Sequence, residues 1–253
     1  MLGTILKPHL TFKSLSEHNV FHGITTRAWD SLNPFVGYNG IDRLARGLAL
    51  SDQSPLLDHI VYAEQIHGSR VHRCVAPDAG SIRLSVDGLV SSEPSLILAV
   101  YVADCIPVLL YDTVTGAVAV LHAGRRGLLA GLIANAVAAL GRYYGAESSN
   151  LVAGMGPGLR SCCYRIQEDI FPELETGGWM QYVENRDGQL FLDLHRACRA
   201  DLLACGIPDN CIEDMGLCTS CRTDLFFSAR KRTEADERGA SFAAIISASV
   251  PAQ

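Results

Sequence analysis

Three apolar segments follow one another in the middle of the chain, and they constrain the fold more than any other feature. They are LILAVYV at 96–102, IPVLLYD at 106–112 and, after the polar stretch 113–116, AVAVLH at 117–122. Short apolar runs bounded by breaks and polar turns are typical of buried strands. The sequence therefore predicts a strand, a break and then a β-hairpin whose turn centres on Thr113 to Gly116.

The position of this turn also predicts the register of the hairpin. Asp112 then faces Ala117, and Pro107 lies opposite His122, so that Cys105 is two residues away from the partner of His122. Diagonal neighbours on one face of a sheet lie roughly 7 to 8 Å apart, which is close enough for their side chains to converge. We therefore expect a thiol and an imidazole to meet at the open end of the hairpin.

The rest of the chain alternates helical and strand patterns. Apolar residues at helical spacing predict a helix after the hairpin, ending near Gly145, and a second helix over 194–205. Short strands are predicted at 150–153, before a glycine-rich loop, and at 242–246. This mixture favours an α+β fold with mixed or antiparallel sheets flanked by helices. Because no linker or repeat interrupts residues 1–253, we expect a single domain.

Charge and composition exclude several partners. Lys and Arg number 21 against 27 Asp and Glu, so the net charge of -6 gives no reason to expect nucleic-acid or anionic-membrane binding. Asp104 interrupts the longest apolar stretch, and the first twelve residues lack a basic start and a cleavage site. We therefore expect a cytoplasmic protein with no membrane partner, in which most of the nine cysteines stay thiols.

His67 resembles Cys105 and His122 in its position, because it also follows an apolar run and precedes a glycine. One cysteine and two histidines, with a fourth position open, form a known catalytic zinc set that lowers the pKa of a coordinated water to about 7. The spacings of 38 and 17 residues match no local metal signature. The pattern by itself therefore leaves two readings open, a metal site and polar residues buried at strand ends.

Several charged residues surround these motifs. In HAGRRG, Arg126 at a helix start could hold a phosphate or carboxylate, although a tight turn with solvated arginines fits the same pattern. We assign Gln65, Asp104 and Arg27 to the orientation of ligands or the binding of substrate, the first two because they neighbour His67 and Cys105. The mixed charges of RKRTEADER at 230–238 are typical of a solvated loop.

Cys218 and Cys221 form a lone C-x-x-C motif with no second pair at zinc-finger spacing. The surrounding pattern is not that of a thioredoxin-like unit. We therefore expect an inert or packing role for these two thiols.

Eight motifs, in one order along nearly the whole chain, carry a family resemblance. They are QIHG at 65–68, VDGLV at 86–90, VADCIPVLLYD at 102–112, HAGRRG at 122–127, GPGLRSCCYRI at 156–166, LDL at 192–194, CTSC at 218–221 and FFSARKR at 226–232. With these motifs the chain resembles the YfiH-like family, which was first labelled multicopper polyphenol oxidase or laccase. The family was later associated with zinc-dependent purine nucleoside phosphorolysis, adenosine deamination and peptidoglycan-precursor editing.

The resemblance implies one zinc per chain, held by His67, Cys105 and His122. It implies phosphorolysis of adenosine, inosine or methylthioadenosine, with a purine nucleoside and phosphate as partners and some adenosine deamination. Cys105, His122 and Arg126 would then be the catalytic residues, and Cys218 would lie near the pocket. Arg125 stands where the family usually has tryptophan, and Arg165 where it usually has an acidic residue. These departures leave the ligands intact but leave substrate choice open.

Three other functions are weighed against the zinc enzyme: a copper oxidase, a cysteine hydrolase and a non-enzymatic binding module. The four coppers of a laccase need paired H-x-H ligands, and the eight histidines of this chain include no such pair. A single blue-copper site needs a weak axial methionine, and no methionine lies near these motifs in the sequence. Copper is therefore the less favoured metal. A cysteine hydrolase or amidase that edits peptidoglycan precursors would use Cys105 as nucleophile and His122 as base, without needing His67. A non-enzymatic binding module would have neither metal nor turnover.

Overall fold

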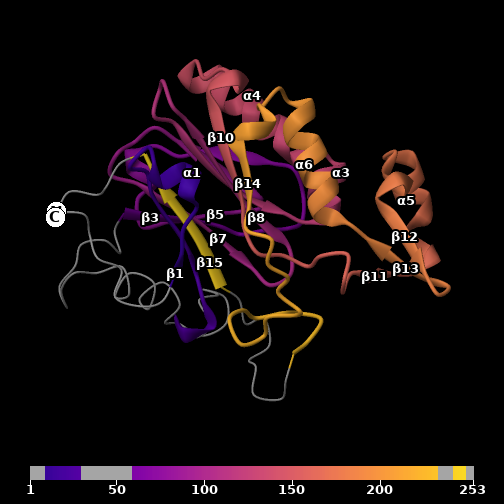
Figure 1. The fold of residues 1–253 in the computed structure, drawn as a ribbon. Helices are drawn as coiled ribbons and strands as arrows, with labels where there is room; N and C mark the ends of the chain where they lie inside the picture. The colour runs from indigo at the N-terminus through magenta and orange to yellow at the C-terminus, as the bar shows by residue number, and fades with distance from the viewer. Residues whose placement is uncertain (1–8, 30–58, 233–241, 249–253) are drawn as a thin grey trace.

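The computed structural model describes residues 9–29, 59–232 and 242–248, and in it the three apolar segments become strands of two different sheets (Figure 1). β7 (Ile97–Val102) belongs to one sheet, whereas β8 (Ile106–Asp112) and β9 (Val118–Ala123) form an antiparallel hairpin in the other. The predicted hairpin is confirmed, and so is its register, because Pro107 pairs with His122. The break at 103–105 is where the chain crosses between the sheets.

Within the described residues, the first sheet has six strands in the order β1-β2-β15-β7-β3-β5. β3 runs parallel to β7 and β5, and the other pairs are antiparallel, so the sheet is mixed. The bounds of its remaining strands are β1 His9–Leu10, β2 Phe21–Thr25, β3 Ile60–Ala63, β5 Ile82–Arg83 and β15 Phe242–Ser247. The predicted last strand is therefore confirmed as β15.

The second sheet also has six strands in the part of the chain that the structure describes, in the order β14-β10-β8-β9-β6-β4. Its edge pairs, β10 with β14 and β4 with β6, are parallel, and its centre is antiparallel. Its other strands are β4 Val71–Arg73, β6 Gly88–Ser91, β10 Leu151–Met155 and β14 Ile212–Asp214. This sheet carries both halves of the predicted thiol–imidazole pair, at the end of the β8–β9 hairpin.

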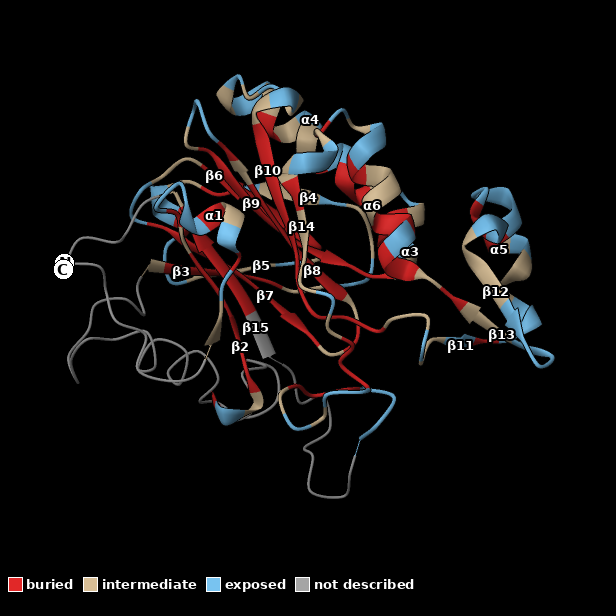
Figure 2. Cartoon of the chain, viewed as in Figure 1, coloured by how far each residue is buried: buried red, intermediate tan, exposed pale blue. Residues whose placement is uncertain are grey.

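The two sheets pack against each other through apolar side chains. Leu98 and Val100 of β7 lie in one buried cluster with Leu109 of β8 and Val120 of β9. Fully burying each such side chain stabilises the fold by roughly 1.5–3 kcal/mol. Because both faces of the central strands are covered, their sequences are continuously apolar rather than alternating (Figure 2).

Two helices cover the outer face of the second sheet, and apolar residues of both join the cluster on that face. They are α4 (Leu132–Tyr144) and α6 (Leu194–Ala204). The helix predicted after the hairpin is interrupted, because Gly131 adopts a φ of 83° between the short α3 (Arg125–Leu129) and α4. α4 ends at Gly145, with a φ of 72°, as predicted.

The remaining elements are small. A three-stranded sheet of β11, β13 and β12 lies with α5 at one side of the molecule (Figure 1). The bounds are α1 Lys13–Ser16, β11 Arg165–Ile166, α5 Phe171–Thr176, β12 Val183–Arg186 and β13 Gln189–Leu192. Within the described ranges, no helix has the length and apolar character needed to cross a membrane. The predicted α+β class, with mixed sheets flanked by helices, is confirmed.

Candidate metal centre

The open end of the β8–β9 hairpin brings Cys105 and His122 together. Cys105 directly precedes β8, and His122 is the second-last residue of β9. His122 is buried, whereas Cys105 remains partly exposed. The pairing of Pro107 with His122 makes Cys105 a diagonal neighbour of the imidazole, as the sequence predicts.

His67 reaches the same place from the loop that follows β3. Its backbone lies in the left-handed region with a φ of 61°, and its ring meets that of His122 edge-on, with 4.8 Å between the ring centroids. The ligand atoms of His67, Cys105 and His122 all lie within 4.8 Å of one another. The structure therefore gathers the three predicted ligands, although they come from three separate segments.

Asp87 holds two of these segments in place. Its carboxylate accepts the backbone N–H groups of Ile66, His67 and Gly68 at 3.2, 2.9 and 2.7 Å. Nδ1 of His122 donates to Oδ1 of the same carboxylate at 2.8 Å. One fully buried side chain thus fixes the backbone of one histidine and the ring of the other.

Asp87 is a residue of the site that motif spacing did not reveal. The available signal was a carboxylate inside the apolar stretch VDGLV, because a charge in such a position has to be compensated by hydrogen bonds. Burial raises the pKa of Asp87, but the hydrogen bonds from His122 and the backbone outweigh burial and hold it below its usual value. The carboxylate is therefore ionised and able to orient the imidazole.

Cys105 and His122 also change each other's proton affinity. Burial raises the pKa of Cys105, but His122 and His67 lower it to about 6. Burial lowers the pKa of His122, but Cys105 and Asp87 raise it to about 9. In the absence of a metal, the two groups form a thiolate–imidazolium pair at neutral pH.

The donor set and the space around it fit a metal ion. A thiolate and two imidazoles suit a borderline-soft ion such as zinc, and Nδ1 of His122 is engaged by Asp87, which leaves Nε2 as the ligand atom. A Cβ atom on Gly124 would lie 2.8 Å from Sγ of Cys105 and 3.4 Å from Cδ2 of His67. Because Gly124 has a negative φ of -86°, space rather than backbone conformation requires glycine there.

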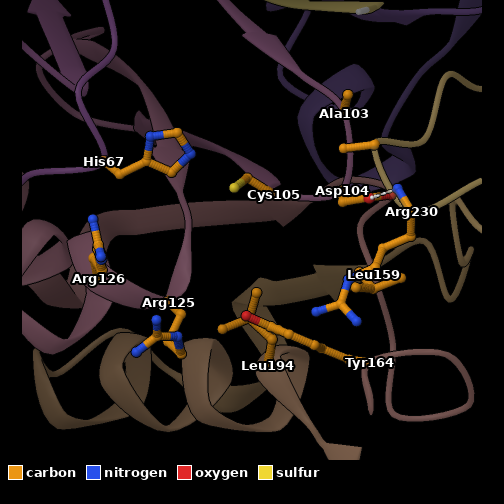
Figure 3. Close-up of a pocket in the computed structure, with 11 residues that line it drawn as sticks. His67, Ala103, Asp104, Cys105, Arg125, Arg126, Leu159, Tyr164, Leu194 and Arg230 are labelled. Carbon is orange, nitrogen blue, oxygen red and sulfur yellow. Dashed lines mark hydrogen bonds between the residues drawn. The ribbon is translucent and has the colours of Figure 1, made fainter. Parts of the chain in front are cut away.

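A cavity of about 400 Å³ opens beside the cluster (Figure 3). Arg125 and Arg126 of α3 lie on one side of it, and Tyr164 and Arg230 lie on the other. The lining residues are His67, Ala103, Asp104, Cys105, Arg125, Arg126, Leu159, Tyr164, Leu194, Ala229 and Arg230. Three arginines at one cavity give it the charge needed for an anionic ligand.

The three arginines differ in their partners. Arg125 forms an ion pair with Glu173, and the guanidinium of Arg230 lies over the ring of Tyr164, 5.2 Å from its centroid. Arg126 is exposed, and the described residues place no carboxylate within ion-pair distance of it. Arg230 also has no ion pair among the described residues, but it donates a hydrogen bond of 2.9 Å to the C=O of Arg165. Arg126 is therefore the guanidinium that can bind an anion without breaking an ion pair or a hydrogen bond to a described residue.

Asp104 lies next to Cys105 and lines the cavity, but both of its carboxylate oxygens are already engaged. Oδ1 accepts the hydroxyl of Thr219 at 2.7 Å, and Oδ2 accepts the backbone N–H of Arg230 at 3.0 Å. Its φ of 94° is unusual for a residue with a side chain, and these hydrogen bonds help to hold that conformation. Its assignment to substrate binding stays a prediction.

Gln65 and Arg27 are not among the described residues that line the cavity. The side-chain amide of Gln65 bonds to the backbone N–H and C=O groups of Tyr101. The guanidinium of Arg27 lies over the ring of Phe227, 4.6 Å from its centroid. The structure thus shows these two side chains supporting neighbouring strands and loops, and their role in substrate binding stays a prediction.

Two other sequence-based expectations change. Arg230 is exposed, as a solvated loop predicts, but it also lines the cavity; residues 233–238 of that segment lie outside the described residues. The C-x-x-C motif of Cys218 and Cys221 does have a second pair of cysteines beside it, Cys162 and Cys163. All four Sγ atoms are within 4.8 Å of one another. The sequence spacing hid this cluster because its halves are more than 50 residues apart.

Comparison with known proteins identifies the family. A family model described as multi-copper polyphenol oxidoreductase laccase matches residues 22–248. The chain belongs to this family. Solved structures with the same fold include the Bacillus licheniformis hypothetical protein YfiH, which superposes with a TM-score of 0.81 at 26% identity, over 94% of this chain and 96% of that one. The structure of YlmD from Geobacillus stearothermophilus superposes with a TM-score of 0.83 at 26% identity, over 97% of this chain and 98% of that one.

Curated relatives of this family member carry names of purine enzymes. The protein named purine nucleoside phosphorylase YlmD of Geobacillus stearothermophilus is 32% identical over 83% of this chain and 84% of its own length. The protein named adenosine deaminase RL5, from an unknown prokaryotic organism, is 32% identical over 79% of this chain and 81% of its own length.

Proposed function

We propose that this chain is a zinc-dependent purine nucleoside phosphorylase that also deaminates adenosine. The observation that carries the proposal is a three-ligand cluster, His67, Cys105 and His122, that lies beside an arginine-lined cavity. The names of the relatives support the same activity. We propose one zinc per chain at this cluster, with a purine nucleoside and phosphate as the small-molecule partners.

The chain's own residues prepare the cluster for a metal. Asp87 orients His122 and fixes the backbone at His67, so that two imidazoles and the Cys105 thiolate converge before any ion is bound. A bound zinc would supply a Lewis acid at one side of the cavity. With three protein ligands, a bound zinc would keep a coordination position for water or substrate.

Phosphorolysis moves a ribosyl group from the purine nitrogen to a phosphate oxygen, so the enzyme has to hold phosphate next to the sugar. We assign this task to Arg126, because it faces the cavity and has no carboxylate partner among the described residues. α3 has only five residues, so its guanidinium groups rather than its backbone end supply the positive charge. Deamination transfers no phosphate and depends less on this charge.

The cavity also suits a nucleoside. Its volume of about 400 Å³ lies within the range of small-molecule sites, and Tyr164, Leu159 and Leu194 give it apolar surface. Tyr164 is the aromatic side chain on which we place the purine, since the position of the family's usual tryptophan is occupied by Arg125. Arg125 is held by Glu173, which keeps its guanidinium at the rim of the cavity.

We also retain the other expectations as part of this proposal. They are one domain over residues 1–253, a cytoplasmic location, and no nucleic-acid or membrane partner. The net charge of -6 supports the absence of polyanionic partners.

Metal content and turnover test the proposal together. Protein purified without added metal should contain zinc, and it should convert inosine and phosphate to hypoxanthine and ribose 1-phosphate, measured by chromatography. Removal of zinc with a chelator should abolish this turnover, and added zinc should restore it. Zinc-loaded protein that turned over neither adenosine nor inosine would contradict the assignment of purine nucleosides as substrates. Copper found in place of zinc would contradict the assignment of the metal.

A cysteine hydrolase acting on an amide of a cell-wall precursor is the second candidate. It is favoured by the arrangement of three side chains: the thiol of Cys105 lies near the imidazole of His122, and that imidazole is oriented by the carboxylate of Asp87. His67 distinguishes the two functions, because a zinc enzyme needs it as a ligand and a cysteine hydrolase does not. His67→Ala should abolish chelator-sensitive nucleoside turnover; amidase activity that survives this substitution and chelation would establish the hydrolase instead.

A further inference from the structure

Four cysteines on two turns form a second group of possible metal ligands, separate from His67, Cys105 and His122. Cys162 and Cys163 lie on the turn before β11, where the backbone N–H of Cys163 bonds to the C=O of Arg160 at 2.9 Å. Cys218 and Cys221 lie on another turn, closed by a bond of 3.0 Å between the N–H of Arg222 and the C=O of Cys218. All four Sγ atoms lie within 4.8 Å of one another, although the two pairs are far apart in the sequence.

Backbone contacts, rather than the thiols, hold the two turns together. Gly158 and Cys218 form an isolated parallel β-bridge, and the N–H of Thr219 donates to the C=O of Gly158 at 3.1 Å. The cysteines therefore meet at a place that the main chain has already fixed. A ligand that joins them would bind to a preformed site rather than assemble one.

The spacing of the sulfur atoms fits one tetrahedral ion. With Zn–S bonds of about 2.3 Å, the sulfur atoms of a four-cysteine site lie about 3.8 Å apart. Sγ of Cys221 is 3.6 Å from Sγ of Cys162 and 3.4 Å from Sγ of Cys163. An iron–sulfur cluster inserts several atoms between its thiolates and needs a wider arrangement than this.

The four cysteines of the cluster differ in their exposure to solvent. Cys162 and Cys221 are exposed, Cys163 is partly exposed, and Cys218 is buried at 5% exposure. An ion can therefore enter from solvent without unfolding of the chain. The buried thiol would then close the inner side of the coordination shell, so that all four positions are filled by protein, as in structural zinc sites.

We propose that Cys162, Cys163, Cys218 and Cys221 bind a second, structural zinc ion. This site shares no residue with the cluster of His67, Cys105 and His122 and does not depend on the function proposed for it. Its coordination would be closed, with four thiolates and no position for substrate. It therefore would have no direct part in the reaction.

The location of the second site gives it a role in shaping the cavity. Thr219, between the two cysteines of one turn, donates its hydroxyl to Asp104, which lines the cavity next to Cys105. Tyr164, directly after Cys163, lines the same cavity. A zinc ion that joins the two turns would hold Tyr164 and, through the hydroxyl of Thr219, Asp104 at fixed positions in the cavity wall.

Zinc content of the full chain tests this assignment. Protein purified under argon with a non-thiol reductant should contain two zinc ions per chain. A Cys162→Ser/Cys221→Ser double variant should contain one, and a His67→Ala/His122→Ala double variant should also contain one, held by the thiols. Cys205→Ser is the matched control, because Cys205 is a partly buried cysteine outside the cluster, and it should keep both ions.

Two outcomes of the zinc analysis would overturn the second site. One is a Cys162→Ser/Cys221→Ser variant that keeps as much zinc as the wild type. The other is a wild-type protein with a single zinc that disappears in the His67→Ala/His122→Ala variant. Failure of the proposed catalytic site would look different, since the thiol-bound ion would remain while only the histidine-dependent ion was missing.

Alkylation of the wild type gives a readout that does not depend on whether a variant folds. Cys162 and Cys221 are exposed, so as free thiols they would react with iodoacetamide readily. Bound zinc should slow their modification at least tenfold, measured by mass spectrometry, and a chelator should abolish the protection. Equal rates with and without the chelator, or a disulfide between Cys163 and Cys221 in the argon-handled protein, would overturn the proposal.

Discussion

Oδ1 of Asp87 accepts a hydrogen bond from Nδ1 of His122 at 2.8 Å and also accepts the backbone N–H of His67 at 2.9 Å. One carboxylate oxygen therefore fixes the relation between two candidate ligands that are 55 residues apart in the sequence. Outer carboxylates of this kind set the tautomer and orientation of ligating histidines.

Asp87→Asn should weaken zinc binding at the cluster of His67, Cys105 and His122 by about 10- to 100-fold. The amide keeps the size of the side chain but loses the charge that orients the imidazole. Competition with a chromogenic chelator measures the affinity. Asp112→Asn is the matched control, because Asp112, at the end of β8, is another fully buried aspartate, accepts two backbone N–H groups and should leave the zinc affinity unchanged. Equal affinities in both variants would contradict the role of Asp87.

Arg126→Ala should lower the rate of phosphorolysis by about a hundredfold or more, since it removes a charge aimed at phosphate. Adenosine deamination, which uses no phosphate, should fall much less. The two rates are measured on the same preparation as ribose 1-phosphate formation and ammonia release. Arg142→Ala, which removes an exposed arginine of α4 that stacks on Tyr143, should change neither. A parallel loss of both activities would place Arg126 in the fold or in nucleoside binding instead.

Gly124→Ala should destabilise the metal-free protein by about 1–3 kcal/mol, because the new Cβ would lie 2.8 Å from Sγ of Cys105. Urea denaturation measures the loss. A double-mutant cycle supplies the control: in a Cys105→Ala background the sulfur atom is gone, so Gly124→Ala should cost much less. An unchanged cost in that background would show that the glycine is needed for some other reason.

Asp214 contributes an acid-sensitive part of the stability. Both of its carboxylate oxygens lie 2.9 Å from Nη1 of Arg160, and Oδ1 also accepts the N–H of Gly216 at 2.8 Å. Burial raises the pKa of Asp214, but His195 and Arg160 outweigh it and hold the pKa well below its usual value. A depressed pKa in the folded state stabilises the protein above the unfolded pKa of about 3.9, and this contribution is lost as the pH falls through the lower, folded value.

Asp214→Asn should therefore lower the free energy of unfolding by about 2 kcal/mol at pH 7, since it removes hydrogen bonds to a charged group. Urea denaturation at a series of pH values should show the difference from the wild type shrinking below about pH 4, as the wild-type carboxylate loses its advantage. A difference that stays constant down to pH 3 would contradict the assignment of this effect to the charge.

Local order in the sequence was enough to predict part of the site. A polar turn between two apolar runs sets which residues of a hairpin face each other, so the pairing of Pro107 with His122, and with it the meeting of Cys105 and His122, followed from residue spacing. The helix after the hairpin, the helix over 194–205 and the last strand were also predicted, because their patterns are local, whereas the short helices α1 and α5 were not. The interruption at Gly131 shows the limit, since apolar spacing continues across a break that a single glycine makes.

Contacts between residues of distant segments were decided by the tertiary structure and not by local sequence patterns. Asp87 receives hydrogen bonds from a loop and from a strand, and no local pattern indicates that both would aim at one carboxylate. The crossing at 103–105, which puts β7 and β8 in different sheets, likewise depends on how the sheets pack. The same holds for Cys163 and Cys221, whose sulfur atoms lie 3.4 Å apart across 58 residues. Spacing along the chain determines contacts within one turn or hairpin, whereas contacts between segments depend on the burial of apolar surface across the whole fold.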